Sequence, residues 1–108
     1  NNKAYIKIKL QKYDEAIDII EPLHNQNKNS VPFADTYALA LINLGKYQQA
    51  NSILEPIWKR TKDVNIGLTY AQSLVKSGEI NFAKQLLQSI DVKTWQQKQL
   101  KEEILKST

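Results

Sequence analysis

Apolar residues recur along this chain at steps of three and four, the spacing that places side chains on one face of an α-helix. Within residues 33–44, Tyr37 and Leu41 follow this spacing, and Gly45 comes directly afterwards. A glycine suits the left-handed backbone conformation with which many helices end. Residues 70–78 repeat the arrangement and also end on a glycine. The pattern predicts an all-α chain of helices joined by short turns.

The whole unit repeats along the sequence. LQKYDEAIDIIEPL at 10–23 matches LGKYQQANSILEPI at 44–57 with an offset of 34 residues, and a diverged third copy starts at Gly78 with an offset of 33. Alanines recur in the same phase, upstream of each copy and early within it: Ala4, Ala38 and Ala71, then Ala16, Ala50 and Ala83. Such a period indicates stacked helical hairpins, in which alanine lets paired helices approach closely. The predicted repeats are 1–30, 31–63 and 64–91.

The last segment, residues 92–106, is predicted to be a helix that caps the stack. Its apolar residues Val92, Leu100 and Ile104 lie in one helical phase, and a stack of hairpins ends in an apolar face that must be covered. We expect Trp95 to pack on the third repeat. Prolines inside the second helices of the first two repeats, at Pro22 and Pro56, predict a kink or an early helix end, because proline lacks an N–H to donate.

The expected fold is therefore an α-α superhelix of about three hairpins plus a C-terminal capping helix, forming a single domain over residues 1–108. The chain contains no methionine, and residue 1 falls in the middle of an expected helix, so we expect it to be a fragment of a longer protein. No apolar run approaches the roughly 20 residues that a membrane-spanning helix requires. We expect no direct membrane insertion.

Composition narrows the chemistry. The net charge is +4, but 14 of the 15 basic residues are lysines spread along the chain, and arginine is the preferred reader of guanine edges. We therefore expect no nucleic-acid partner. The chain has no cysteine and one histidine, so we expect neither a metal site nor a cofactor. The one triad-like set, His24, Ser30 and Asp35, lacks a nucleophile motif, so we expect no enzyme activity in this chain.

The segment LINLGKYQQANSILEPI, on its 34-residue period, resembles the tetratricopeptide repeat family, and the resemblance extends over residues 1 to about 90. Gln11 departs from it by standing where glycine is usual. The resemblance implies a right-handed superhelix whose first helices line a concave face that binds peptides or partner proteins. Carried over by position, that face comprises Tyr5, Ile8, Lys9, Asp35, Leu39, Ile42, Asn43, Leu68, Gln72, Val75 and Lys76. Tyr5 and Leu39 replace the asparagines of members that grip a C-terminal carboxylate, so that ligand is not expected.

A narrower resemblance is to the C-terminal repeat region of bacterial periplasmic HExxH zinc metallopeptidases that act in outer-membrane protein assembly. It rests on KYDEAIDIIEPL and on the following repeat, and it implies a docking region whose catalytic domain lies elsewhere, since no HExxH occurs here. It favours the periplasm. The alternative is a generic scaffold domain of a cytoplasmic multi-protein assembly. The partner's identity and the oligomeric state stay open, and apolar surface at the first hairpin leaves self-association open as well.

Overall fold

The computed structural model describes residues 2–108, which form seven α-helices and no strand. The helices are α1 (Asn2–Lys9), α2 (Tyr13–Gln26), α3 (Val31–Asn43), α4 (Tyr47–Thr61), α5 (Val64–Lys76), α6 (Ile80–Ser89) and α7 (Trp95–Lys106). Successive helices pack antiparallel as three hairpins, and α7 packs along α5. The predicted all-α class, the three hairpins and the C-terminal helix are confirmed.

One turn geometry closes every hairpin. The second residue after each first helix has a positive φ: 61° at Gln11, 78° at Gly45 and 92° at Gly78. In the second hairpin the Lys46 N–H donates to the Leu41 carbonyl at 2.8 Å, and the same bond recurs at 2.8 Å and 2.9 Å in the others. This bond, whose donor lies five residues after the acceptor, supplies a hydrogen-bond donor to a carbonyl that has none within the end of the helix. The turns therefore aim each second helix back along the first in the same way.

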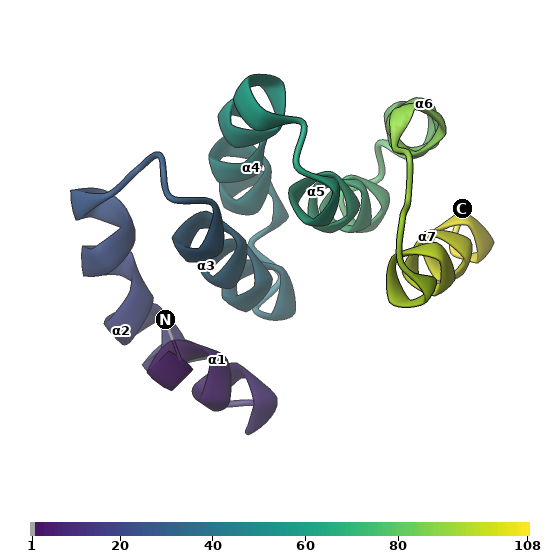
Figure 1. Cartoon of the computed structure of the whole chain (residues 1–108). Coiled ribbons are helices and arrows are strands. Elements are labelled where there is room, and N and C mark those ends of the chain that lie inside the picture. The colour runs from purple at the N-terminus through teal and green to yellow at the C-terminus, as the bar shows by residue number, and fades with distance from the viewer. Residues whose placement is uncertain (1) are drawn as a thin grey trace.

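The helices form two curved rows (Figure 1). The inner row comprises α1, α3, α5 and α7, and each of its members packs against the next. The outer row comprises α2, α4 and α6, which pack on inner-row helices and make at most marginal contact with one another. Because the helices of the inner row contact each other and those of the outer row hardly do, the stack curves toward the inner row, as in a superhelix.

The alanines that recur with the repeat are fully buried. Ala16, Ala50 and Ala83 at the start of the outer-row helices expose no surface, and neither do Ala4, Ala38 and Ala71 in the inner row. Their neighbours in the core are large aliphatic side chains, among them Ile20, Leu54 and Leu74. Small residues at the helix contacts let the backbones approach and leave the larger ones to fill the space between rows. The predicted packing role of these alanines is confirmed.

Both prolines lie inside their helices without ending them. The helix containing Pro22 continues to Gln26, and the helix containing Pro56 continues to Thr61, so the expected early end is wrong. Each proline is exposed, and so is the residue four positions earlier, whose carbonyl loses its usual helical donor. Water can satisfy that carbonyl on the exposed side, so the helix tolerates the missing bond.

The capping helix begins later than predicted, and Trp95 does not pack on the third repeat. Residues 90–94 form an extended connection, and α7 starts at Trp95 under a capping box in which the Thr94 hydroxyl and the Gln97 side chain each bond the other's backbone N–H. Trp95 is 70% exposed, whereas Ile104 is 4% exposed. Nine steps of about 100° separate the two residues, which puts them on opposite sides of the helix.

Candidate functional site

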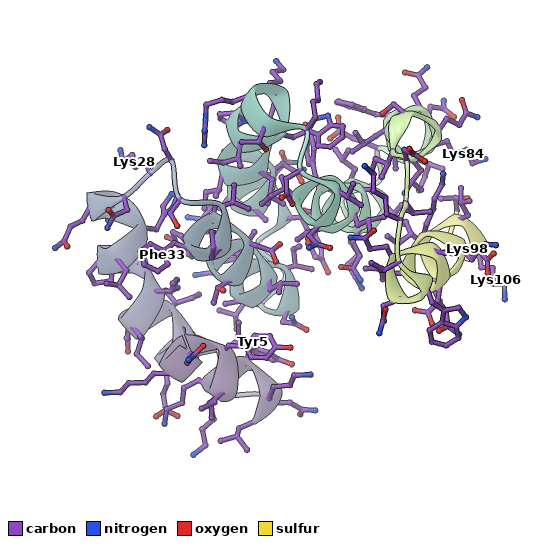
Figure 2. The ribbon with its side chains drawn as sticks, in the orientation of Figure 1. Tyr5, Lys28, Phe33, Lys84, Lys98 and Lys106 are labelled. Atoms are coloured by element: carbon purple, nitrogen blue, oxygen red, sulfur yellow. The ribbon has the colours of Figure 1, made fainter. Side chains whose placement is uncertain are left out.

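All eleven residues of the predicted binding face lie on the inner row. Three are on α1, four on α3 and four on α5, and α3 packs against both of the other helices. The structure therefore brings the three sets onto adjacent helices. Figure 2 shows the Tyr5 side chain on the side of α1 that faces α3. We call this set of residues the inner face.

The inner face has a buried floor and an accessible surface. Ile42 is 6% exposed and Leu68 is 1% exposed, so both belong to the core and support the face from beneath. Leu39, Val75 and Ile8 are half-buried, and Gln72 is half-buried beside them. Tyr5, Lys9, Asn43 and Lys76 are exposed. A partner could touch the half-buried and exposed members, but not the two floor residues.

Asp35 is tied to the neighbouring repeat. The Thr69 hydroxyl of α5 donates to its Oδ1 atom at 2.7 Å. Burial raises the pKa of the Asp35 carboxyl to about 6, against a lowering by the Thr69 hydrogen bond and with a further rise from Asp63. This carboxyl is half-buried and already has a partner, so it joins two repeats within the inner face.

Three exposed members of the inner face, Asn43, Lys9 and Tyr5, make short-range contacts. The Asn43 amide donates to the Leu39 carbonyl one turn earlier at 2.8 Å, which leaves its side-chain oxygen without a hydrogen bond to residues 2–108. The Lys9 ammonium lies 5.2 Å from the centre of the Tyr5 ring, within the range of a cation–π contact. These contacts hold an amide and an aromatic ring at the accessible surface.

The capping helix narrows the inner face at the third repeat. Gln72, Val75 and Lys76 face α7 across a pocket of about 190 Å³, whose other wall includes Leu100 and Glu103. The spacing of Leu100 and Ile104 predicted that α7 would cover an apolar surface, but not that it would stand beside α5 in the inner row. The third set of residues is therefore less open than the first two sets.

The sequence analysis missed two links between repeats. The Tyr37 hydroxyl donates to Glu21 at 2.7 Å, and the Tyr70 hydroxyl donates to Glu55 at 3.0 Å. Burial and the glutamate raise the pKa of Tyr37 to about 12 and that of Tyr70 further. The signal was present in the sequence, because the Glu-Pro pair recurs at 34 residues and the tyrosine at 33.

The triad-like residues are each engaged separately. The Ser30 hydroxyl accepts the Phe33 N–H at 3.3 Å as the N-cap of α3, Asp35 accepts from Thr69, and the His24 ring meets the edge of Tyr37. Across residues 2–108, no three His, Cys, Asp or Glu side chains gather as a metal site would require.

No helix within residues 2–108 has both the length and the apolar character needed to cross a membrane. The inner face combines a curved shape with a mixture of apolar and amide side chains. In comparisons with protein families, with curated proteins and with solved structures, nothing matches this chain.

Proposed function

We propose that this chain is a non-catalytic protein-interaction module of tetratricopeptide type, which binds an extended segment of a partner protein along its inner face. One observation carries the proposal. The half-buried Leu39 lies on α3, between the Tyr5 side of α1 and the Gln72 side of α5. It thus lies at the centre of a curved surface that mixes apolar and polar side chains.

The chemistry of this surface suits a peptide. Leu39 and Val75 retain apolar surface that a partner's side chain would remove from water. The free oxygen of Asn43 can accept a backbone N–H, and the Gln72 amide can bond either backbone group. Extended peptides present both groups along their length, so main-chain bonds supply affinity while apolar contacts supply specificity.

The recurring motif LINLGKYQQANSILEPI supports the tetratricopeptide assignment, together with the turn geometry that all three hairpins share. We further propose that this region serves as the docking part of a periplasmic zinc metallopeptidase. The alternative is a scaffold domain in a cytoplasmic assembly. Both contexts use the inner face in the same manner and differ in the partner.

A photoreactive amino acid at Leu39 in the full-length protein tests the proposal in the source cell. The matched control carries the same group at Gln85, which is exposed on the outer-row helix α6. We expect a defined protein to be captured from Leu39 and not from Gln85, and Asn43→Ala to weaken its binding about tenfold through the lost amide. Equal capture at both sites would contradict binding at the inner face.

If outer-membrane assembly components are captured from Leu39, the peptidase context is supported. If subunits of a cytoplasmic complex are captured instead, the scaffold alternative is supported.

A further inference from the structure

A second concave surface lies away from the inner face. A groove of about 500 Å³ opens between the end of α2, the turn that follows it and α4, where the outer-row helices stand apart. Ile53, Pro56 and Ile57 supply its apolar wall, and His24, Lys28 and Arg60 supply its polar wall. Figure 2 shows Lys28 on the turn at the outer side of the molecule. We call this cavity the outer groove.

The two cations of the outer groove are not neutralised. The ion pairs within residues 2–108 join Lys7 to Glu15 and Lys59 to Glu55, so neither Lys28 nor Arg60 belongs to one. Arg60 donates through Nη2 to the Asn29 carbonyl at 2.7 Å, which holds the guanidinium at the groove and leaves its other N–H groups available. No carboxylate lines the cavity. The groove is therefore suited to an anion.

His24 adds hydrogen-bonding capacity to the wall. The residue is 8% exposed, its ring meets Tyr37 edge-on at 5.3 Å, and its Nδ1 atom has no hydrogen-bond partner in residues 2–108. Burial, and then the nearby Lys28, lower the pKa of the imidazole. The ring is accordingly neutral at physiological pH and can pair with a polar group. Buried polar groups usually have a hydrogen-bond partner, so this atom requires one that residues 2–108 do not supply.

The next junction between repeats shows what a closed version of this groove looks like. Trp58 stands 34 residues after His24 and Lys62 stands 34 after Lys28, and both line the corresponding cavity of about 340 Å³. There the Lys62 ammonium lies 5.0 Å from the Trp58 ring centre, and Asp91 adds a carboxylate to the wall. The second cavity therefore contains its own aromatic ring and its own anion. The lining of the outer groove has no carboxylate and no tryptophan, and the outer groove is larger.

We propose that the outer groove binds an acidic segment of a protein, with an apolar side chain against Ile53 and Ile57 and a neighbouring carboxylate between Lys28 and Arg60. An apolar wall beside two cations matches a peptide that carries both an apolar side chain and a carboxylate. A bare polyanion such as a nucleic acid would use the cations and leave the apolar wall empty. The site is separate from the inner face, so the chain can hold two segments at once.

Panning a displayed library of random 12-residue peptides against the chain tests the proposal. We expect peptides enriched in aspartate or glutamate next to leucine, isoleucine or phenylalanine. Lys28→Glu combined with Arg60→Glu should weaken the selected peptides at least about tenfold, since the anion loses both partners. The matched control, Lys46→Glu with Lys98→Glu, reverses two exposed lysines that do not line the outer groove and should leave binding unchanged.

Copying the second junction into the first provides an independent variant. His24→Trp with Ala34→Gly introduces the indole and the glycine that the chain places one repeat later, at Trp58 and Gly67, without altering charge. We expect it to weaken the peptides about tenfold by filling the groove, while circular dichroism shows a folded chain. Absence of acidic-apolar enrichment overturns the proposal, as does equal loss in the lysine control, or an oligonucleotide that binds as tightly as the peptides.

Discussion

Gly67 shows how tightly one residue can be constrained by a neighbour in another repeat. A Cβ atom built at this position of α5 would lie 2.7 Å from the Trp58 ring and 2.8 Å from the Ile90 side chain. Both neighbours are core residues. At the preceding junction between repeats, Ala34 occupies the position equivalent to Gly67. The smaller His24 occupies the position equivalent to Trp58. Glycine and tryptophan therefore act as a pair.

Replacement of Gly67 by alanine should destabilise the chain. In an open helix the change would stabilise by about 1 kcal/mol, because alanine favours helix. Here the added methyl group must displace a buried ring, and overpacking of a core typically costs about 1–3 kcal/mol. We expect a net loss in urea unfolding, and a gain would contradict the close contact. Gly67→Ala with Trp58→His, which copies the His24–Ala34 pair of the preceding junction, should recover part of the loss.

Asp35 makes the stability of the chain depend on pH. Its folded-state pKa of about 6 lies above the ordinary value of 3.8, so the folded form holds its proton more tightly than the unfolded form. The favourable contribution is complete below about pH 4 and is lost as pH rises through 6. At 1.36 kcal/mol per unit, the full difference is roughly 3 kcal/mol.

Asp35→Asn keeps an oxygen acceptor for Thr69 and removes the titration. We expect the variant to be more stable than the parent at pH 7.5 and about equally stable at pH 4, as measured by urea unfolding at both values. Asp91→Asn, which removes an exposed carboxylate outside the inner face, serves as the control for the loss of one negative charge. A parent chain whose stability is flat between pH 4 and 7 would contradict the raised pKa of Asp35.

At the level of helices and turns, the three hairpin turns share one hydrogen-bond pattern but not one residue. Gly45 and Gly78 adopt a positive φ without strain, whereas Gln11 adopts 61° with a side chain attached. A left-handed conformation costs a non-glycine residue roughly 1 kcal/mol. The turn nevertheless forms at Gln11, where the Lys12 N–H donates to the Lys7 carbonyl at 2.8 Å as in the other two turns.

Gln11→Gly should therefore stabilise the first hairpin by roughly 0.5–1 kcal/mol, since relief of strain exceeds the entropy that glycine loses on folding. Thermal unfolding of the two chains measures the difference. The reciprocal change, Gly45→Gln, should destabilise by a similar amount, because nothing lies within 4 Å of an added Cβ and only the backbone conformation resists it. If Gln11→Gly were neutral, the strain assigned to this turn would be wrong.

Periodicity predicted the helices and the turns because both depend on residues close in sequence. The inner-face residues came instead from the tetratricopeptide resemblance, and all of them lie on inner-row helices. Neither source predicted depth, so Ile42 and Leu68 were grouped with exposed neighbours, and neither predicted that Trp95 would be exposed. The Asp35–Thr69 bond and the outer groove depend on how two helices more than thirty residues apart approach each other. Hydrophobic spacing within one helix carries no such information.

For the molecule as a whole, stability is distributed along the stack. Most helices pack chiefly on their neighbours in sequence, and the inner-row helices also pack on the nearest member of their row. α1 is held by a single fully buried residue, Ala4, whereas α5 contacts α3, α4, α6 and α7. Stacked repeats unfold in units whose stability reflects the neighbours they touch.

Hydrogen exchange followed by mass spectrometry should show this gradient. We expect the amides of α1 to exchange first and those of α5 last, with α7 between them. Uniform exchange across all seven helices, at the rate of global unfolding, would show instead that the stack opens as one cooperative unit.

The gaps within the outer row also determine how this molecule would respond to force. The inner-row helices are in mutual contact and resist compression, whereas the outer-row helices have room to separate or to close. The stack should therefore bend most easily about its inner row. A segment bound in the outer groove would push α2 and α4 apart and increase the curvature of the inner row on the opposite side. Occupation of the outer groove would in this way change the distance between the two ends of the inner row.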